Sequence, residues 1–320
     1  MKITAKKAAA YLRKANDILI LSHQNPDGDT LGAALALFYG LRQLGKRVRI
    51  ECADGIPERF RLEALPEFEA FEPQCIVAVD IAALQLLGKS MQKYADRIDL
   101  CIDHHPTNTG YARRLLLHGR AAATCEIMYE LFLLMKLEIT PMIASYLYMG
   151  LATDTGCFKF SNTTAETHYA AAGLIGLGAD YIRINVRFFE TKSKSRILIE
   201  RQALDSMRFY FKERCAMVVV SRKMIEETHA DESELDGISA IPRQIEGVEV
   251  GITLREKENG RYKVSMRSGE SIDVSKICAL LGGGGHMRAS GCVVEGNLEE
   301  AVEKVLHAVG SYTEWDGETV

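Results

Sequence analysis

The sequence predicts an α/β fold whose N-terminal part is built on a parallel sheet, followed by a smaller α+β domain. Short apolar runs typical of buried strands alternate with stretches whose apolar residues recur at helical spacing. Near residue 190 this alternation gives way to hairpin-like runs mixed with helices. Acidic residues and histidines also gather where the N-terminal strands are predicted to end. A chain of 320 residues is long enough for two domains.

The N-terminal elements alternate in type along the chain. Thr4 is a suitable cap for a first helix ending at Lys14, and Pro141 is suited to the first turn of a later helix. The predicted strands cover 17–21, 48–52, 75–81 and 98–102. The predicted helices cover 30–44, 84–94, 121–136, 141–152 and 164–177, the last ended by Gly178. This order favours parallel strands joined by crossover helices.

The C-terminal elements are of mixed type. A charged helix over 192–211 is expected to bridge two domains. Predicted strands cover 215–221, 248–256, 261–267 and 292–294, with Asn259-Gly260 as a hairpin turn. Predicted helices cover 272–281 and 298–309. We therefore predict a domain over 1–190, a helical linker over 191–211 and a second domain over 212–320.

The composition is that of an ordinary soluble globular protein. Hydrophobic residues make up 47% and charged residues 26% of the chain, and the net charge is −4. This charge does not favour long duplex nucleic acid or an anionic membrane as a partner, and no apolar run approaches the roughly 20 residues that span a bilayer. The eight cysteines are scattered without CxxC pairs. Reduced thiols and a cytoplasmic location are expected.

The loop between the first predicted strand and the helix over 30–44 concentrates charge. His23, Asp27 and Asp29 lie within seven residues, and Pro26 and Gly28 favour a tight backbone around them. Two carboxylates about 4 Å apart repel each other by about 4 kcal/mol at an effective dielectric constant near 20. A positive group should therefore lie between them, and a metal ion is the simplest candidate.

Further acidic residues follow other apolar runs. Asp80 closes the run 75–79, Asp103-His104 closes 100–102, and Asp154 follows 146–151, where we expect another strand end. A single Asp after a strand is more often a turn or a helix cap. Strand ends of a parallel sheet meet at one edge, however, so four such loops favour a shared site. We predict that six residues converge: His23, Asp27, Asp29, Asp80, His104 and Asp154.

Four carboxylates and two imidazoles without a thiolate are ligands that suit manganese, magnesium, iron or zinc, and they disfavour a structural zinc site. Four aspartate charges balance two divalent ions. Paired ions about 3.5–4 Å apart lower the pKa of water and stabilise charge on a phosphoryl group. The set therefore indicates hydrolysis of a phosphoester.

These residues resemble the motifs of a known family. His23-x-x-x-Asp27-x-Asp29, Asp80, Asp103-His104-His105 and Asp154 are similar to the four motifs of the DHH phosphoesterases. The run Gly282–Gly285 with His286, followed by Arg288-Ala289-Ser290-Gly291, resembles the signature of the DHH-associated C-terminal domain. The resemblance implies a phosphodiesterase with two manganese ions, magnesium or cobalt remaining open, and a substrate held between the domains.

The resemblance also implies individual roles. His23, Asp27 and Asp80 would bind one ion; Asp29, Asp80, His104 and Asp154 would bind the other, so that Asp80 bridges both. His105 would face the substrate phosphate or leaving group, and Asp103 would orient a histidine. Both are expected to be catalytic.

A second predicted group, in the C-terminal domain, would bind substrate phosphate. A run of glycines lets the backbone approach an anion, and Arg267 offers two donors to phosphate. The alternative is a flexible glycine linker with an incidental histidine. The predicted residues are Arg267, Ser268, Gly283, Gly284, Gly285, His286, Arg288 and Ser290.

Within the family, the compact two-domain form is most similar to enzymes that degrade short oligoribonucleotides and convert 3′,5′-bisphosphate nucleotide (pAp) to AMP. We therefore expect short RNA and phosphorylated nucleotides as partners. A phosphodiesterase of cyclic di-AMP or pApA is the alternative, and a non-catalytic nucleotide-binding protein is a third reading. The resemblance leaves a homodimer open.

Overall fold

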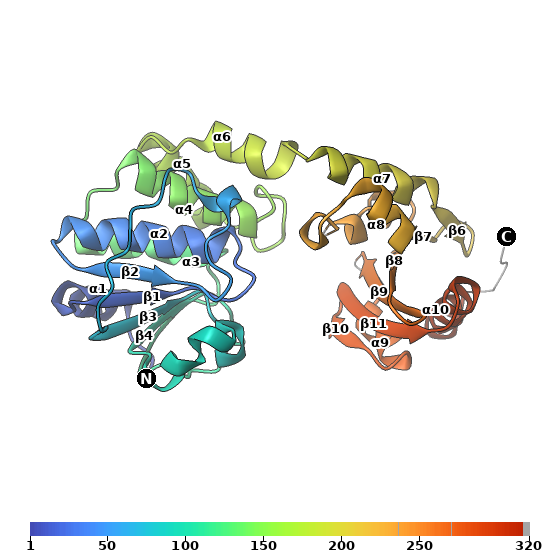
Figure 1. Ribbon diagram of the computed structural model, residues 1–320, viewed down its shortest axis with the longest axis horizontal. Coiled ribbons are helices and arrows are strands. Elements are labelled where there is room, and N and C mark those ends of the chain that lie inside the picture. The colour runs from blue at the N-terminus through green and yellow to red at the C-terminus, as the bar shows by residue number, and fades with distance from the viewer. Residues whose placement is uncertain (236, 270, 316–320) are drawn as a thin grey trace. The chain divides into compact units, whose positions relative to one another are not determined.

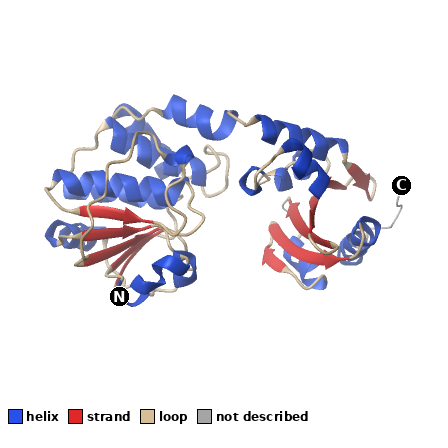
Figure 2. Ribbon diagram, viewed as in Figure 1, coloured by secondary structure: helices blue, strands red, loops and turns tan. Residues whose placement is uncertain are grey.

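The computed structural model describes residues 1–235, 237–269 and 271–315, and the chain divides into two compact units, Met1–Thr191 and Lys192–Val320 (Figure 1). The first unit contains a parallel sheet and the second a mixed sheet (Figure 2), which confirms the predicted fold class. Residues 316–320 of the predicted second domain, and the single residues 236 and 270, lie outside the described residues.

The sheet of the first unit has five strands in the order β2-β1-β3-β4-β5, all parallel. They are β1 (Ile18–Leu21), β2 (Val48–Glu51), β3 (Cys75–Val79), β4 (Leu100–Asp103) and β5 (Arg114–Leu117). The first four were predicted. The fifth was not, because a four-residue strand that begins with an arginine gives little local signal and depends on its pairing with β4.

The two faces of this sheet are covered differently. Ile18 and Ile20 pack with the helices α1 (Ala5–Lys14), α2 (Gly28–Gln43), α3 (Thr124–Met135) and α4 (Pro141–Asp154). Leu19 and Leu21 face the other side and pack against the segment 84–97. This segment was predicted as an α-helix over 84–94, but it forms two 3₁₀ segments, Leu84–Leu87 and Lys89–Arg97. Gly88 separates them with φ 76° and ψ 159°, a conformation that no helix continues.

The two predicted helix-start residues of this unit are confirmed. Thr4 accepts a hydrogen bond from the amide of Lys7, and Pro141 occupies the first turn of α4. Thr164, predicted as the first residue of a helix, is the N-cap of α5 (Ala165–Gly176). The unit ends with α6 (Tyr181–Asn185) and a π-helical turn, Val186–Glu190.

The strand order creates a favourable place for a site. The chain leaves β1 to form β2 on one side and later places β3 on the other side of β1. The connections that follow β1 and β3 therefore run in opposite directions, and in parallel sheets such a switch point is the usual place for a ligand. The loop 23–29 and Asp80 both lie at this edge.

The sheet of the second unit has the order β10-β11-β9-β8-β7-β6, and only the β7–β8 pair is parallel. Its strands are β6 (Arg208–Tyr210), β7 (Cys215–Val220), β8 (Val250–Lys257), β9 (Arg261–Ser268), β10 (Gly284–His286) and β11 (Ala289–Glu295). Asn259 and Gly260 turn β8 into β9 with φ of 59° and 63°, as the Asn-Gly pair predicts. The helices α9 (Val274–Leu280) and α10 (Leu298–Thr313) pack on one face.

The predicted linker 191–211 contains α7 (Lys194–Asp205) and β6. Ile199 and Ala203 of α7 are fully buried and pack with Val218 and Val220 of β7. A short helix, α8 (Arg222–Thr228), lies beside α7 (Figure 1). The helix over 194–205 thus contributes to the core of the second unit. No helix in the described part of the chain is long and apolar enough to cross a membrane.

Close packing of α2 on α4 gives a first prediction. A Cβ added to Gly32 would lie 2.5 Å from the carbonyl oxygen of Tyr146 in α4. We expect Gly32→Ala to reduce the free energy of unfolding by about 1–3 kcal/mol, because one helix must shift. Urea denaturation measures the change.

The matched control is Gly176→Ala, since a Cβ at the exposed Gly176 of α5 meets nothing within 4 Å. This substitution should leave stability unchanged or raise it by about 0.4–1 kcal/mol. Equal stability of Gly32→Ala and the unsubstituted protein would contradict the packing described here.

Candidate metal centre

The structure brings the six predicted metal-ligating residues together in the first unit. Their donor atoms, with those of His105, form three groups, and within each group all the atoms lie within 4.8 Å of one another. Two of the residues, Asp80 and His104, each belong to two groups, so that the groups form one continuous cluster. The groups are His23, Asp27 and Asp80; Asp29, His104 and Asp154; and Asp80, His104 and His105.

Asp154 reaches this cluster from a helix. The helix predicted over 141–152 is present as α4, and Asp154 is its last residue, so the strand end that we also expected after 146–151 is wrong. The run 146–151 is apolar on all sides because α4 is buried in the core of the unit. Burial and the neighbouring charge of Asp29 raise the pKa of Asp154 to about 8.

The first group is oriented by His23. Its Nδ1 donates to the backbone carbonyl of Gln24 over 2.8 Å, since a carbonyl can only accept. Its Nε2 therefore faces Asp27 Oδ1 and Asp80 Oδ2, each 3.7 Å away. Burial disfavours the imidazolium, but interactions with these two carboxylates outweigh burial and raise the pKa of His23 to about 11.

The second group is oriented in the same way by His104. Its Nδ1 donates to the carbonyl of Ala121 over 3.2 Å. Its Nε2 then lies 4.0 Å from Asp29 Oδ2, 3.6 Å from Asp80 Oδ1 and 3.4 Å from Asp154 Oδ2. A backbone acceptor on one ring nitrogen is the usual way to aim the other nitrogen at a metal ion.

These separations fit a metal site better than a hydrogen-bond network. Distances of 3.4–4.0 Å between the His104 nitrogen and the three carboxylates exceed those of N–H···O hydrogen bonds, about 2.7–3.2 Å. Neighbouring ligands each about 2.1 Å from one ion are separated by about 3–3.5 Å. Small inward shifts would place these donors around a cation.

The charges of the cluster support the same conclusion. Burial, together with the charges of Asp80 and Asp27, raises the pKa of Asp29 well above its ordinary value. The pKa values of His23 and Asp154 are raised as well, so the cluster attracts protons at neutral pH. Divalent cations would satisfy the same excess of negative charge and would compete with these protons. The residues present therefore fit divalent metal ions.

Asp80, which joins two of the groups, has an unusual backbone. Its φ is 59°, a left-handed conformation that is uncommon for residues other than glycine, and only 2% of the residue is exposed. The amide of Asp80 donates to the carbonyl of Ile102 in β4 over 2.9 Å. Such strained residues concentrate at functional sites, where the surrounding structure holds them in place.

Asp103 and His105 form a hydrogen-bonded pair beside the cluster. The fully buried Asp103 accepts hydrogen bonds from His105 Nδ1 over 2.8 Å and from Asn108 Nδ2 over 2.6 Å. The bond to Asp103 raises the pKa of His105 to about 9, although burial opposes this. Burial would raise the pKa of Asp103, but its hydrogen bonds with His105 and Asn108 outweigh burial and lower it.

Sequence reasoning missed two residues that hold this site. Asn108 donates to Asp103, and the hydroxyl group of Thr124 donates to Asp80 Oδ1 over 2.9 Å. Asn108 lies three residues after His105, which is the only signal that could have indicated it. Thr124 gives no local signal, because it is far from Asp80 in the sequence.

In the second unit, the glycine run forms part of a strand pair. The strand β10 lies antiparallel to β11, which places Gly285 opposite Ser290 and His286 opposite Ala289. A Cβ on Gly283 would lie 2.3 Å from the carbonyl oxygen of Gly291, and Gly285 has φ 147°. These two glycines are required by strand packing, whereas a Cβ on Gly284 meets nothing within 4 Å.

The other predicted substrate-binding residues divide into buried and accessible ones. Ser268 and Ser290 are buried, and their hydroxyl groups donate to the carbonyls of Ile272 and His286 over 2.6 and 2.9 Å. Both serines therefore hold the loops in place. Arg267 is half-buried at the end of β9, and its burial lowers the pKa of the guanidinium. His286 and Arg288 are exposed.

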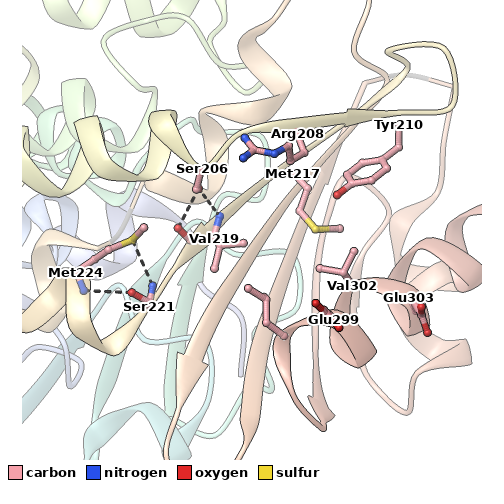
Figure 3. Close-up of a pocket in the computed structure, with 11 residues that line it drawn as sticks. Ser206, Arg208, Tyr210, Met217, Val219, Ser221, Met224, Glu299, Val302 and Glu303 are labelled. Carbon is pink, nitrogen blue, oxygen red and sulfur yellow. Dashed lines mark hydrogen bonds between the residues drawn. The ribbon is translucent and has the colours of Figure 1, made fainter. Parts of the chain in front are cut away.

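A groove elsewhere on the second unit contains none of the predicted site residues (Figure 3). Its lining mixes apolar side chains, among them Met217, Val219 and Val302, with polar and charged ones such as Arg208 and Glu299. At its side, the hydroxyl group of Ser206 bonds to both the amide and the carbonyl of Val219. Ser206 thus supplies hydrogen-bond partners for Val219 of β7, which lies beyond the part of β7 that pairs with β6.

The sequence is similar to known proteins along nearly its whole length. Residues 17–151 match the model of the DHH family, N-terminal domain, and residues 215–314 match that of the DHHA1 domain. A protein of Thermus thermophilus named bifunctional oligoribonuclease and PAP phosphatase NrnA is 34% identical, over 91% of this chain and 89% of its own. This chain belongs to the DHH family.

Other relatives agree with this assignment. A Bacillus subtilis protein of the same name is 27% identical, over 87% of this chain and 89% of its own length. The crystal structure of an exopolyphosphatase-related protein from Bacteroides fragilis is 25% identical and has a TM-score of 0.86, covering 97% of this chain and 96% of that one. The likeness to this structure therefore includes residues of both units.

The Asp103–His105 pair gives a second prediction. In protein stripped of metal, His105 should titrate near pH 9, and Asp103→Asn should move its pKa back towards 6.5. Because the folded-state pKa lies above that of the unfolded chain, the stabilisation is fully present below about pH 6.5 and is lost as the pH rises through about 9. NMR titration of the ring nitrogens measures both values. The same pKa in both proteins would show that Asp103 does not hold the proton on His105.

Proposed function

We propose that the protein is a two-metal phosphodiesterase that hydrolyses short oligoribonucleotides to mononucleotides and converts pAp to AMP. The observation that carries this proposal is the cluster in which Asp80 and His104 each join two groups of potential metal ligands. A shared carboxylate between two ligand groups is the arrangement that paired metal ions require. The names of the relatives in Thermus thermophilus and Bacillus subtilis support the substrates.

In this proposal, His23, Asp27 and Asp80 hold one ion, and Asp29, Asp80, His104 and Asp154 hold the other. We propose manganese, since a mixed set of carboxylate and imidazole ligands suits it, with magnesium or cobalt as alternatives. When bound, the ions would lower the pKa of the attacking water and stabilise the charge that develops on the phosphoryl group.

His105 is the proposed general acid. Its Nδ1 is bonded to Asp103, which fixes the ring and leaves a proton on Nε2 for the leaving oxygen. The bond with Asp103, which raises the pKa of the ring, favours this protonated form. Asp103 would stay ionised and orient the ring, while Asn108 orients Asp103.

The second unit would bind substrate through Arg267, His286 and Arg288. A guanidinium can bind a phosphate with two parallel hydrogen bonds. The exposed Gly284 leaves room for a ligand beside the backbone. These few basic side chains lie on a chain whose net charge is −4. Because a long duplex needs many phosphate contacts, they favour small phosphorylated substrates. We further propose a cytoplasmic location, since the eight cysteines are free thiols.

The test of the proposed function is a substrate panel with manganese: pAp, pApA, cyclic di-AMP and RNAs of increasing length. We expect AMP from pAp and mononucleotides from the shortest RNAs, with Asp80→Asn as the inactive control, because that substitution weakens a ligand of both ions. Chromatography of the products measures both. Turnover of cyclic di-AMP or pApA alone would instead indicate a phosphodiesterase of cyclic di-AMP or pApA. If no substrate gave a product, a non-catalytic nucleotide-binding protein would be favoured.

A further prediction concerns the division of roles between the units. Arg267→Ala should raise KM for pAp by about tenfold or more, because a charge-assisted contact with phosphate contributes about 1.5–3 kcal/mol. The metal content of the protein, measured by mass spectrometry of the eluted ions, should not change. Arg208→Ala on the exposed edge strand β6 is the control. A fall in metal content in Arg267→Ala would refute this division.

A further inference from the structure

The start of α3 has an unusual cap. Its N-cap residue, Ala123, has no side chain that can accept a hydrogen bond. The carboxylate of Asp29, from the first turn of α2, takes that place: it accepts the amide of Thr124 over 2.6 Å and that of Cys125 over 2.9 Å. These amides would otherwise lack partners within the helix, and the positive end of the helix dipole favours a carboxylate there.

The same threonine also binds the carboxylate at the centre of the cluster. The hydroxyl group of Thr124 donates to Asp80 Oδ1 over 2.9 Å, and Thr124 is fully buried. The other oxygen of Asp80, Oδ2, faces His23. One residue of α3 therefore contacts two carboxylates from different parts of the unit: Asp29 in the first turn of α2, and Asp80 directly after β3.

We propose that Thr124 is a positioning residue that sets the carboxylates of Asp29 and Asp80 for the two metal ions. Its hydroxyl group fixes the rotation of the Asp80 carboxylate, so that Oδ1 faces His104 while Oδ2 faces His23. A carboxylate oxygen has two lone pairs, so accepting this hydrogen bond leaves Oδ1 able to bind a cation. The amide of Thr124 anchors Asp29 in the second group. This inference rests on the proposed two-metal function.

A purely structural role for Thr124 has different consequences. If its hydroxyl only filled a polar pocket, its loss would change the free energy of unfolding and leave metal affinity unchanged. If it positions Asp80, its loss frees the carboxylate to rotate and leaves a buried oxygen without its donor. Metal affinity then falls, and serine, which keeps the hydroxyl group, restores it.

The experiment compares the full-length protein with Thr124→Val, Thr124→Ala and Thr124→Ser after removal of metal. Manganese is titrated into each protein by calorimetry. We expect two ions per chain in the unsubstituted protein, an affinity about 10–100-fold lower in the valine and alanine variants, and near-complete recovery in the serine variant. Thr228→Val, which removes another buried helical hydroxyl in the second unit, is the matched control and should not change the affinity.

Kinetics supply a second readout. With pAp, kcat of Thr124→Ala should fall at limiting manganese and recover in part as manganese is raised, with KM for pAp little changed. If the valine variant does not fold, the serine variant, which has the hydroxyl group, is still compared with the alanine variant, which lacks it. Equal manganese affinity of the alanine and serine variants would overturn the proposal. A protein that binds manganese with these differences but hydrolyses no substrate would instead overturn the proposed function.

Discussion

The repulsion among buried carboxylates is the constraint on which the first unit depends. Asp29 is completely buried and Asp80 is 2% exposed, and both belong to the same cluster. Such charges are unfavourable in a protein interior unless donors or cations surround them. The fold supplies donors in fixed places: two amides at the start of α3 bind Asp29, and one hydroxyl group binds Asp80.

The same constraint explains why the cluster lies where it does. Only at the switch between β1 and β3 do two adjacent strands send their following loops apart, which leaves space for several side chains. The Nδ1 atoms of the two histidines are held by the backbone carbonyls of Gln24 and Ala121, so that each ring directs its Nε2 into the cluster. The left-handed backbone of Asp80 is tolerated because β4 holds its amide.

The sequence predicted what depends on local pattern. The alternation of apolar runs gave four strands of the first sheet, and the spacing of His23, Asp27 and Asp29 identified the central loop. Local pattern could not reveal features that depend on contacts between residues far apart in the sequence. The short strand β5 exists through its pairing with β4. The helix α4 was predicted over 141–152, but the position of its last residue, Asp154, beside the other ligands depends on how α4 packs in the core. Thr124 was missed for the same reason, since its partner Asp80 lies 44 residues away.

The second unit shows how one sequence pattern can serve two purposes. A run of glycines predicted a phosphate-binding loop, yet Gly283 and Gly285 are already required by the close approach of β10 to β11. The buried hydroxyl groups of Ser268 and Ser290 likewise hold backbone carbonyls. Of the other predicted residues, Gly284, His286 and Arg288 are exposed and Arg267 is half-buried. Conformational constraint therefore accounts for four of the eight predicted residues, and the contacts with an anion that we propose would come from the other four.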